Sequence, residues 1–582
     1  MINEALNDEV RSNVSSAKRL ETDSQPINST NQQLNDFVKC ICLVTFDVDH
    51  GQTIEAIYPP TVTLSDVDRA NISYNSFPDT TSSCPRDTTY HFRYRTTCPP
   101  TTLSNDFKRF NQSVPVSLQA DEDDFVFGFV HFRFQKQVDA PRGYFQKLYY
   151  HVYRFLRCSN TWSMFWLTAF FDAGEAIIEA ACEHIKSWPS PIPNETLCMP
   201  LLGQLIVARI PCLTDLPHRH QLVESTANVV SSHPNPITIS QVYETNFYES
   251  TKSILVHLQL LWELVLIGES VLVMTPNPSF SSEIVQSLVS LIWPIRYYGD
   301  FRPFLTIHDS DFHKFTSVVP APSAILGVTN PFFAKALNHW PNLLRIGDPV
   351  GQAFNADRLF KKTADGKLLD SKPGLYTLHR PLLNSDRSLA KKLNKVGERP
   401  DAVQNSILRR HFLELTQSFM IPLERYLSSL MPLKKNISPF KSQQMRSFEL
   451  DDFLSTITQT GPLLTCGIVG KWSALYKRFV GSPNFDGWLR ERLTEVDRQL
   501  NCVYLDVVCD FEFTADVLRQ HEQIEVVDLV LRLRDLLSSD ANLSNDRRSR
   551  LQRQLETILN VVDEDLQLVL MSNGPLRDLV EA

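Results

Sequence analysis

The chain has 582 residues, of which 43% are hydrophobic and 10% aromatic, enough apolar material for about two to four globular domains. Its formal net charge of −9 argues against nucleic acid as a partner, because phosphate contacts rely on clustered Lys and Arg. The 11 cysteines are scattered, with none at the spacing of metal or redox pairs, so we expect reduced thiols in the cytosol.

Residues 1–36 are polar and lack hydrophobic periodicity, and no basic and apolar signal-peptide pattern opens the chain. Such a segment cannot bury enough surface to offset the entropy of ordering. We therefore predict a disordered head.

From residue 37 the pattern changes to strands. Residues 38–58 predict a hairpin turning at Gly51, because glycine supplies the positive φ that a tight turn needs. Further strands are expected at 89–95 and 125–134, and an aromatic-rich helix at 144–156. Strands followed by helices predict an α+β lobe over 37–187.

The Pro-rich residues 188–193 predict a boundary, followed by a second lobe over 188–348. This lobe alternates helices with short strands, which indicates a mostly parallel sheet. The expected helices are 258–267 and 281–291, and the expected strands are 270–274, 304–307 and 324–328. The apolar run 254–274 carries His257, Gln259, Glu263 and Glu269, so we interpret it as a buried helix and strand rather than a membrane span.

Residues 349–400 predict a linker or insert, and 401–582 a helical subdomain. One apolar stripe recurs at helical spacing and should form a long packing helix that Pro422 kinks; its members are Leu408, Phe412, Leu415, Phe419, Leu423, Tyr426 and Leu430. Two later helices are expected at 526–537 and 551–562.

The sequence offers no convincing catalytic pattern, so we expect no catalytic residues, no metal and no cofactor. Gly467 to Lys471 imitates a phosphate loop, but Thr465 and Trp472 break its spacing, and a helix-terminating glycine pair is the alternative. His218 and His220 suggest either a metal contact or a solvated loop. The acidic residues 121–124 suggest either calcium or a basic partner, or a solvated strand entry.

Several motifs together resemble one known family. Phe46-Asp47, His50-Gly-Gln52 and Glu55-Ala-Ile-Tyr-Pro59 are similar to the opening of DENN-domain proteins, and the motifs that follow keep the order of DENN subfamily six. These later motifs stand at 76–79, 142–147, 261–264, 298–303 (Tyr-Gly-Asp-Phe-Arg-Pro), 325–333, 370–374, 413–419 and 482–488. The chain departs from the subfamily pattern before residue 36, at 213–247 and at 351–367.

The resemblance implies a bilobed α/β fold, with an α+β longin-like N-lobe, an α/β DENN C-lobe and a helical C-terminal subdomain. It implies a guanine nucleotide exchange factor that grips a Rab-family GTPase, GDP-bound or nucleotide-free, along both lobes. For this subfamily it implies a Rab of the endocytic recycling route, a cytoplasmic protein recruited to recycling endosomes, and peripheral or indirect membrane contact. Exchange requires no acid, base or nucleophile.

The candidate GTPase contacts lie on loops at strand ends within these motifs: Tyr58, Pro59, Asp300, Phe301, Arg302, Asn330, Phe332, Phe333, Asp370 and Ser371. Each also has a structural alternative, since these residues can shape a turn, fill the core or cap a backbone. If Asp300 and Arg302 are contacts, replacing both by Ala should weaken exchange and leave the melting temperature nearly unchanged.

Two other functions stay open. A trafficking adaptor or scaffold would share the Rab interface without favouring the empty GTPase. A GTPase-activating partner would need an arginine presented to the nucleotide, for which Arg302 is the candidate.

Overall fold

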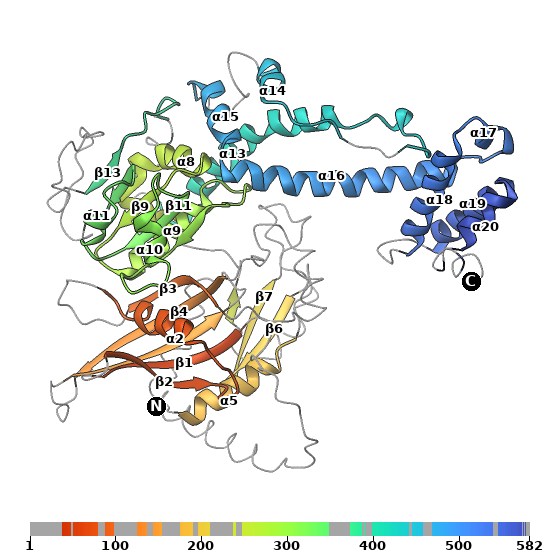
Figure 1. The fold of residues 1–582 in the computed structure, drawn as a ribbon. Coiled ribbons are helices and arrows are strands. Elements are labelled where there is room, and N and C mark those ends of the chain that lie inside the picture. Colours follow the sequence, from red (N-terminus) through yellow and green to blue (C-terminus); the bar gives the residue numbers. More distant parts are fainter. Residues whose placement is uncertain are drawn as a thin grey trace, which may run out of the picture. The chain divides into compact units, whose positions relative to one another are not determined.

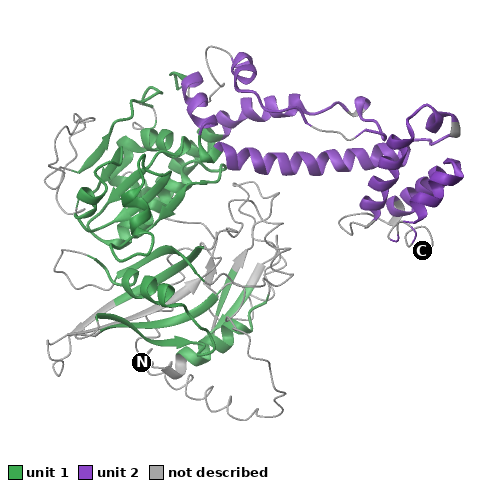
Figure 2. Cartoon of the chain, in the orientation of Figure 1, with its two compact units in different colours: residues 1–416, 465–471, 482–484 green, residues 417–464, 472–481, 485–582 purple. Residues whose placement is uncertain are grey.

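The computed structural model describes two compact units (Figure 2). Unit 1 comprises residues 1–416, 465–471 and 482–484, and unit 2 comprises 417–464, 472–481 and 485–582. Within these units the described residues are 38–47, 51–79, 88–97, 125–136, 144–153, 175–189, 196–209, 237–239, 247–347, 373–386, 389, 399–441, 445–457, 468–538, 545–572, 574 and 577. The expected head, the acidic run 121–124, His218 and His220 lie outside them.

Unit 1 begins with a five-stranded antiparallel sheet of order β2-β1-β5-β4-β3 (Figure 1). Its strands are β1 (Val38–Asp47), β2 (Gly51–Tyr58), β3 (Thr88–Arg95), β4 (Phe125–Lys136) and β5 (Tyr144–Tyr153). The predicted hairpin is confirmed, and Gly51 has a φ of 77°, which glycine adopts without a steric cost. Helix α2 (Asp66–Asn75) starts at Ser65, whose side chain accepts a hydrogen bond from the Asp68 amide.

The prediction of a helix at 144–156 is wrong, because residues 144–153 form β5. This strand pairs with β1 on one side and β4 on the other, so it lies in the interior of the sheet. Its sequence is rich in Tyr and Phe, residue types that favour strands. An aromatic run without Gly or Pro is ambiguous in sequence, and here the pairing partners decide its structure.

A smaller sheet of order β6-β7-β8 follows. Its elements are α5 (Glu175–Lys186), which precedes it, and strands β6 (Thr196–Leu201), β7 (Gln204–Arg209) and β8 (Ile237–Ile239). The end of α5 is bound to the β6–β7 hairpin. The Trp188 indole donates to the Pro200 carbonyl at 2.9 Å, and the Leu202 amide donates to His184 Nδ1 at 3.0 Å.

The second lobe of unit 1 is built on a five-stranded sheet of order β10-β11-β9-β12-β13, parallel except for β13. Its strands are β9 (Val271–Met274), β10 (Asp300–Arg302), β11 (Ala324–Val328), β12 (Asn342–Arg345) and β13 (Gly374–Thr377). Its helices are α7 (Phe247–Thr251), η3 (Lys252–His257), α8 (Leu258–Leu266), α9 (Pro278–Ser290), α10 (Phe312–Ser317) and α11 (Phe333–Ala336). The predicted parallel sheet and bilobed α/β fold are confirmed.

The strand expected at 304–307 is wrong. The chain forms β10 before Pro303 instead, and Phe304 and Leu305 are buried outside any strand. Proline removes a ladder donor, so a strand tends to end near it. The residues after Pro303 then meet the first lobe.

A strap formed by residues 382–386 crosses α8. The buried Glu263 carboxylate accepts hydrogen bonds from the amides of Leu382 and Leu383 at 2.9 and 3.1 Å. Gln259, one helical turn earlier, donates to the Asn384 carbonyl at 2.7 Å. The buried helix expected at 258–267 thus contains the polar residues Gln259 and Glu263, whose side chains bind this strap.

Gly470 of the phosphate-loop imitation is structural. It forms an isolated β-bridge with Leu383, and a Cβ at Gly470 would lie 2.6 Å from the Leu382 carbonyl oxygen. The Lys471 amide donates to the same carbonyl at 2.8 Å. Gly470 precedes α15 (Trp472–Val480) and does not end a described helix. Gly467, the other glycine of the expected helix-terminating pair, lies outside the described residues, so the expectation for the pair stays a prediction.

Helix α13 (Asp401–Leu430) contains Pro422 and the predicted apolar stripe, whose members are all buried. Its first half packs in unit 1, where the Trp262 indole donates to Thr416 Oγ1 at 2.9 Å. In unit 2, Phe419 stacks on Tyr476 with ring centroids 4.4 Å apart. The prediction that this stripe serves packing is confirmed.

Unit 2 is helical (Figure 1). Besides the second half of α13 it contains η5 (Lys434–Asn436), α14 (Leu450–Thr456), α15, α16 (Pro483–Asp510), α17 (Ala515–Arg519), α18 (Gln523–Ser538), α19 (Asn545–Val561) and α20 (Glu564–Met571). The predicted helices at 526–537 and 551–562 are confirmed. A core between α18 and α19 includes Leu529, Val530, Leu533, Leu551 and Leu555.

Candidate functional site

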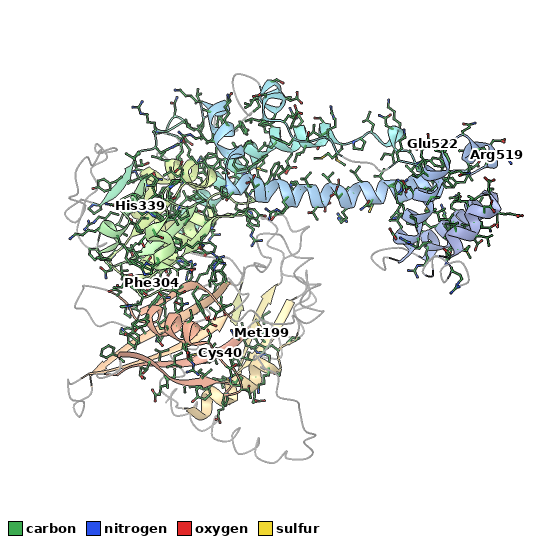
Figure 3. All side chains as sticks on the ribbon, in the orientation of Figure 1. Cys40, Met199, Phe304, His339, Arg519 and Glu522 are labelled. Carbon is green, nitrogen blue, oxygen red and sulfur yellow. The ribbon has the colours of Figure 1, made fainter. Side chains whose placement is uncertain are left out.

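The candidate functional site is the lobe seam of unit 1, where α2, β3 and β4 meet α9, β10 and the turn 303–311. Phe304, labelled in Figure 3, belongs to the second lobe in sequence but packs in the core of the first. Its ring meets Tyr90 edge-on at 5.2 Å. The two lobes therefore share a hydrophobic contact beneath the polar groups of the seam.

Arg302 is the centre of the polar seam, and its side chain has 0% exposure. Its Nε lies 3.1 Å from Asp300 Oδ1, and its Nη1 lies 4.0 Å from Asp309 Oδ1. It also pairs with Asp311 and donates to the carbonyl of Arg93, on β3, at 3.2 Å. One guanidinium therefore binds three carboxylates and the other lobe's backbone.

Arg93 completes the link from the first lobe. Its Nη1 lies 3.3 Å from Asp300 Oδ1 and donates to the Phe301 carbonyl at 3.3 Å. The guanidinium carbon stands 3.6 Å from the centre of the Phe125 ring, a cation–π geometry that stabilises a desolvated charge. Sequence reasoning missed Arg93, although a charged residue alternating with Phe92 and Tyr94 on a strand was a usable signal.

The seam's carboxylates are in unequal environments. Burial would raise the pKa of Asp300, but the charges of Arg302 and Arg93 outweigh it, and this pKa is lowered. For Asp309 burial prevails over the charge of Arg302, and its pKa is raised. The pKa of Arg302 is raised, since its burial is outweighed by the surrounding carboxylates. The cluster therefore holds Arg302 charged in the interior.

Helix α2 adds hydrogen bonds from uncharged side chains to the seam. Asn75 accepts from the Thr306 hydroxyl at 2.9 Å and donates to Asp309 Oδ2 at 2.9 Å. Asn71 accepts from the Ser310 amide at 3.0 Å. These side chains satisfy the buried turn after Phe304, which would otherwise leave polar groups unpaired.

A second crossing lies after β11. Asn330 Nδ2 donates to Asp79 Oδ2 at 2.9 Å, and the Thr329 hydroxyl donates to the Asp79 carbonyl. Asn330 Oδ1 accepts from the Phe332 amide at 2.9 Å. Phe332 itself is 51% exposed, so a large aromatic side chain is held at the surface by a fixed loop.

The structure places the sequence-predicted site residues in three groups. Tyr58, Pro59, Phe301, Arg302 and Phe333 are buried; Asp300 and Asn330 are partly buried; Phe332 is exposed. Asp370 and Ser371 lie outside the described residues. Direct GTPase contact by any of them stays a prediction, but the buried side chains present no surface in this conformation.

Two further properties bear on chemistry. Among the described residues no group of His, Cys, Asp and Glu has the arrangement of a metal site. None of the described helices combines the length and hydropathy needed to cross a bilayer. The seam's cations are all engaged with carboxylates, so the arrangement fixes the lobes and the adjoining loops.

The fold and the seam define a bilobed α/β protein whose two lobes are joined by buried ion pairs. Comparison with known proteins identifies its family. The chain is 41% identical over 551 residues to Protein DENND6A of Mus musculus, covering 92% of this chain and 90% of the relative. It is 40% identical over 548 residues to Protein DENND6B of Homo sapiens, covering 92% and 93%.

More distant similarity extends to the Protein DENND6 homolog of Dictyostelium discoideum, 29% identical over 607 residues and covering 92% of this chain and 82% of the relative. The family model described as the DENND6 C-terminal domain matches residues 513–573. The chain belongs to the DENND6 family of DENN-domain proteins, as its motifs predicted.

Proposed function

We propose that this protein is a guanine nucleotide exchange factor that promotes GDP release from a Rab-family GTPase of the endocytic recycling route. The observation that carries the proposal is similarity to DENND6 proteins over 92% of the chain. The partner is the GDP-bound or nucleotide-free GTPase. The protein acts from the cytoplasm and reaches recycling endosomes through peripheral or indirect membrane contact.

GDP release requires the exchange factor to offset a large free energy of nucleotide binding. A nucleotide held with picomolar affinity has a binding free energy of about 16 kcal/mol, so the exchange factor must stabilise the empty GTPase by binding its switch loops in another shape. Only the difference in interface energy between the empty and the nucleotide-bound GTPase promotes GDP release. A rigid surface on which loops from both lobes keep a fixed spacing suits this task, because less binding energy is lost in ordering it.

The second crossing, which lies after β11, offers such a surface. Phe332 projects from a loop that Asn330 ties to Asp79 of the other lobe. Exposed aromatic side chains with fixed backbones are typical centres of protein interfaces. We therefore propose Phe332 as a direct GTPase contact, Asp300 and Asn330 as partly exposed neighbours, and the buried Tyr58, Pro59, Phe301, Arg302 and Phe333 as positioning residues. Asp370 and Ser371 stay in the proposal as contacts.

Phe332→Ala should lower kcat/KM for GDP release about tenfold, because truncating an interface anchor costs more than 1 kcal/mol. The melting temperature should change little, since the side chain is half exposed. Stopped-flow release of a fluorescent GDP analogue measures the first quantity.

Val319→Ala is the matched control. Val319 is apolar and 75% exposed, and it precedes β11 whereas Phe332 follows it. The control should exchange nucleotide like the wild type. Equal rates of GDP release for all three proteins would show that Phe332 is not in the interface. Equal losses of kcat/KM in both variants would mean that the effect is nonspecific.

A further inference from the structure

A short segment of unit 2, Ile437–Phe440, is inserted among the C-terminal helices. Phe440 is buried and its ring stacks on His521, with centroids 3.7 Å apart and planes at 15°. Phe511 and Phe513 meet the same ring edge-on at 6.1 and 5.9 Å. Ile437, Phe440 and Phe513 belong to the hydrophobic core at the ends of α16 and α18, and Phe511 packs against it. We use the term pocket for the side chains around the Phe440 ring, which are His521, Phe511 and Phe513.

The inserted segment is a turn that makes its own hydrogen bonds. The Lys441 amide donates to the Ser438 carbonyl at 3.4 Å, and the Phe440 amide donates to Ser438 Oγ at 3.3 Å. Pro439 follows Ser438, the order that favours a β-turn. Because proline fixes φ, little conformational entropy is lost when such a turn docks.

Side chains of the helices recognise the backbone of this turn. The Tyr504 hydroxyl, on α16, donates to the Pro439 carbonyl at 2.8 Å. Arg532 Nη2, on α18, donates to the Phe440 carbonyl at 2.7 Å. Peptide-binding sites combine hydrogen bonds to the peptide backbone with a pocket for an anchoring side chain, and aromatic anchors often dominate the binding energy; the Phe440 turn has both features.

The pocket also has a charged rim. His521 pairs through Nδ1 with Glu525 Oε2 at 2.9 Å, which fixes the ring on which Phe440 stacks. The hydrogen bond from His521 lowers the pKa of Glu525, and the charge of Lys441 lowers it further. The residue after the turn is therefore complementary in charge to the pocket.

We propose that the C-terminal helices carry a peptide-binding site for an aliphatic-Ser-Pro-Phe turn, and that Ile437–Phe440 occupies this site in cis. The pocket residues Phe513, His521 and Arg532 fall within the matched C-terminal domain, 513–573, whereas the turn comes from before α16. A peptide of the same chemistry competes with the turn for the pocket.

The test uses a fluorescent peptide of residues 431–441 and the full chain carrying Phe440→Ala, which empties the pocket of its anchor. We expect the peptide to bind this variant at least tenfold more tightly than the wild type, whose site is filled. A peptide with the same Phe→Ala change should not bind. Equal binding to both chains, or no binding to a folded Phe440→Ala chain, would overturn the proposal.

Adding Tyr504→Phe to the emptied chain is the second arm, because it removes one donor and keeps the ring. Peptide affinity should fall about threefold to tenfold. An unchanged affinity would mean that the peptide binds elsewhere, which contradicts the proposed site. Size-exclusion chromatography of the wild type should show no dimer; a dimer held by exchanged turns would overturn occupation in cis.

If Phe440→Ala prevents folding, Tyr504→Phe alone still tests the site by amide hydrogen exchange. Exchange should accelerate at 437–441 while Leu529, Val530 and Leu533 of α18 keep their protection. A uniform loss of protection would mean that the turn is an inseparable part of the core, and the proposal would fail.

Discussion

Arg302→Ala should lower the stability of unit 1 by about 3–5 kcal/mol, the usual consequence of removing one partner from a buried ion pair. The substitution leaves Asp300, Asp309 and Asp311 beside each other without the charge that balances them. It also removes the donor to the Arg93 carbonyl. Thermal unfolding followed by circular dichroism should show a melting temperature lower by roughly 10 °C.

This expectation is the opposite of the one drawn from sequence, in which replacing Asp300 and Arg302 spares the melting temperature. Because Arg302 is buried, it cannot be the arginine that a GTPase-activating protein presents to the nucleotide in this conformation.

Arg498→Ala is the control for Arg302→Ala, because its pair with Glu495 is solvent-exposed and such pairs contribute little. A melting temperature unchanged by Arg302→Ala would contradict the structural role of the seam. Arg302→Lys should be intermediate, since lysine keeps the charge but cannot reproduce the guanidinium fork.

Gly327→Ala should be similarly damaging, with a loss of about 3 kcal/mol. Gly327 lies within the buried strand β11, and a Cβ there would stand 2.2 Å from Ser281 Oγ and 2.3 Å from the Pro303 carbonyl oxygen. The serine can rotate, but the carbonyl belongs to the backbone just before Phe304. Relief of the clash would therefore move the chain that carries the seam.

The matched control for this prediction is Gly481→Ala. A Cβ at Gly481 would meet its nearest neighbours at 3.7 and 3.9 Å, which is ordinary contact, so its melting temperature should stay close to that of the wild type. Urea titration should separate the two variants clearly. Equal midpoints would show that β11 has room for a side chain beside Pro303.

Local pattern predicted most of the fold. The β1–β2 hairpin, β11 and the stripe of α13 follow from alternation, turn residues and helical spacing, each a property of neighbouring residues. The failures have physical reasons. Residues 144–153 became a strand because β1 and β4 pair with both its edges, and 304–307 turned away from the sheet to meet α2.

The site was less accessible to sequence reasoning. The motif 298–303 drew attention to Asp300 and Arg302, but whether a charged residue is exposed depends on partners distant in sequence. Arg93 is separated from Asp300 by 207 positions, and Asn75 from Asp309 by 234. A short sequence motif carries no information on residue pairs so distant in sequence. It therefore could not distinguish a direct GTPase contact from a positioning residue.

Release of a fluorescent GDP analogue from a panel of purified Rabs tests most directly whether this protein releases GDP from a Rab. The full chain is added in catalytic amounts, with magnesium present. We predict multiple turnovers on one or two endosomal Rabs. Binding of a Rab in a pull-down without acceleration on any member of the panel would contradict exchange and favour the adaptor or scaffold.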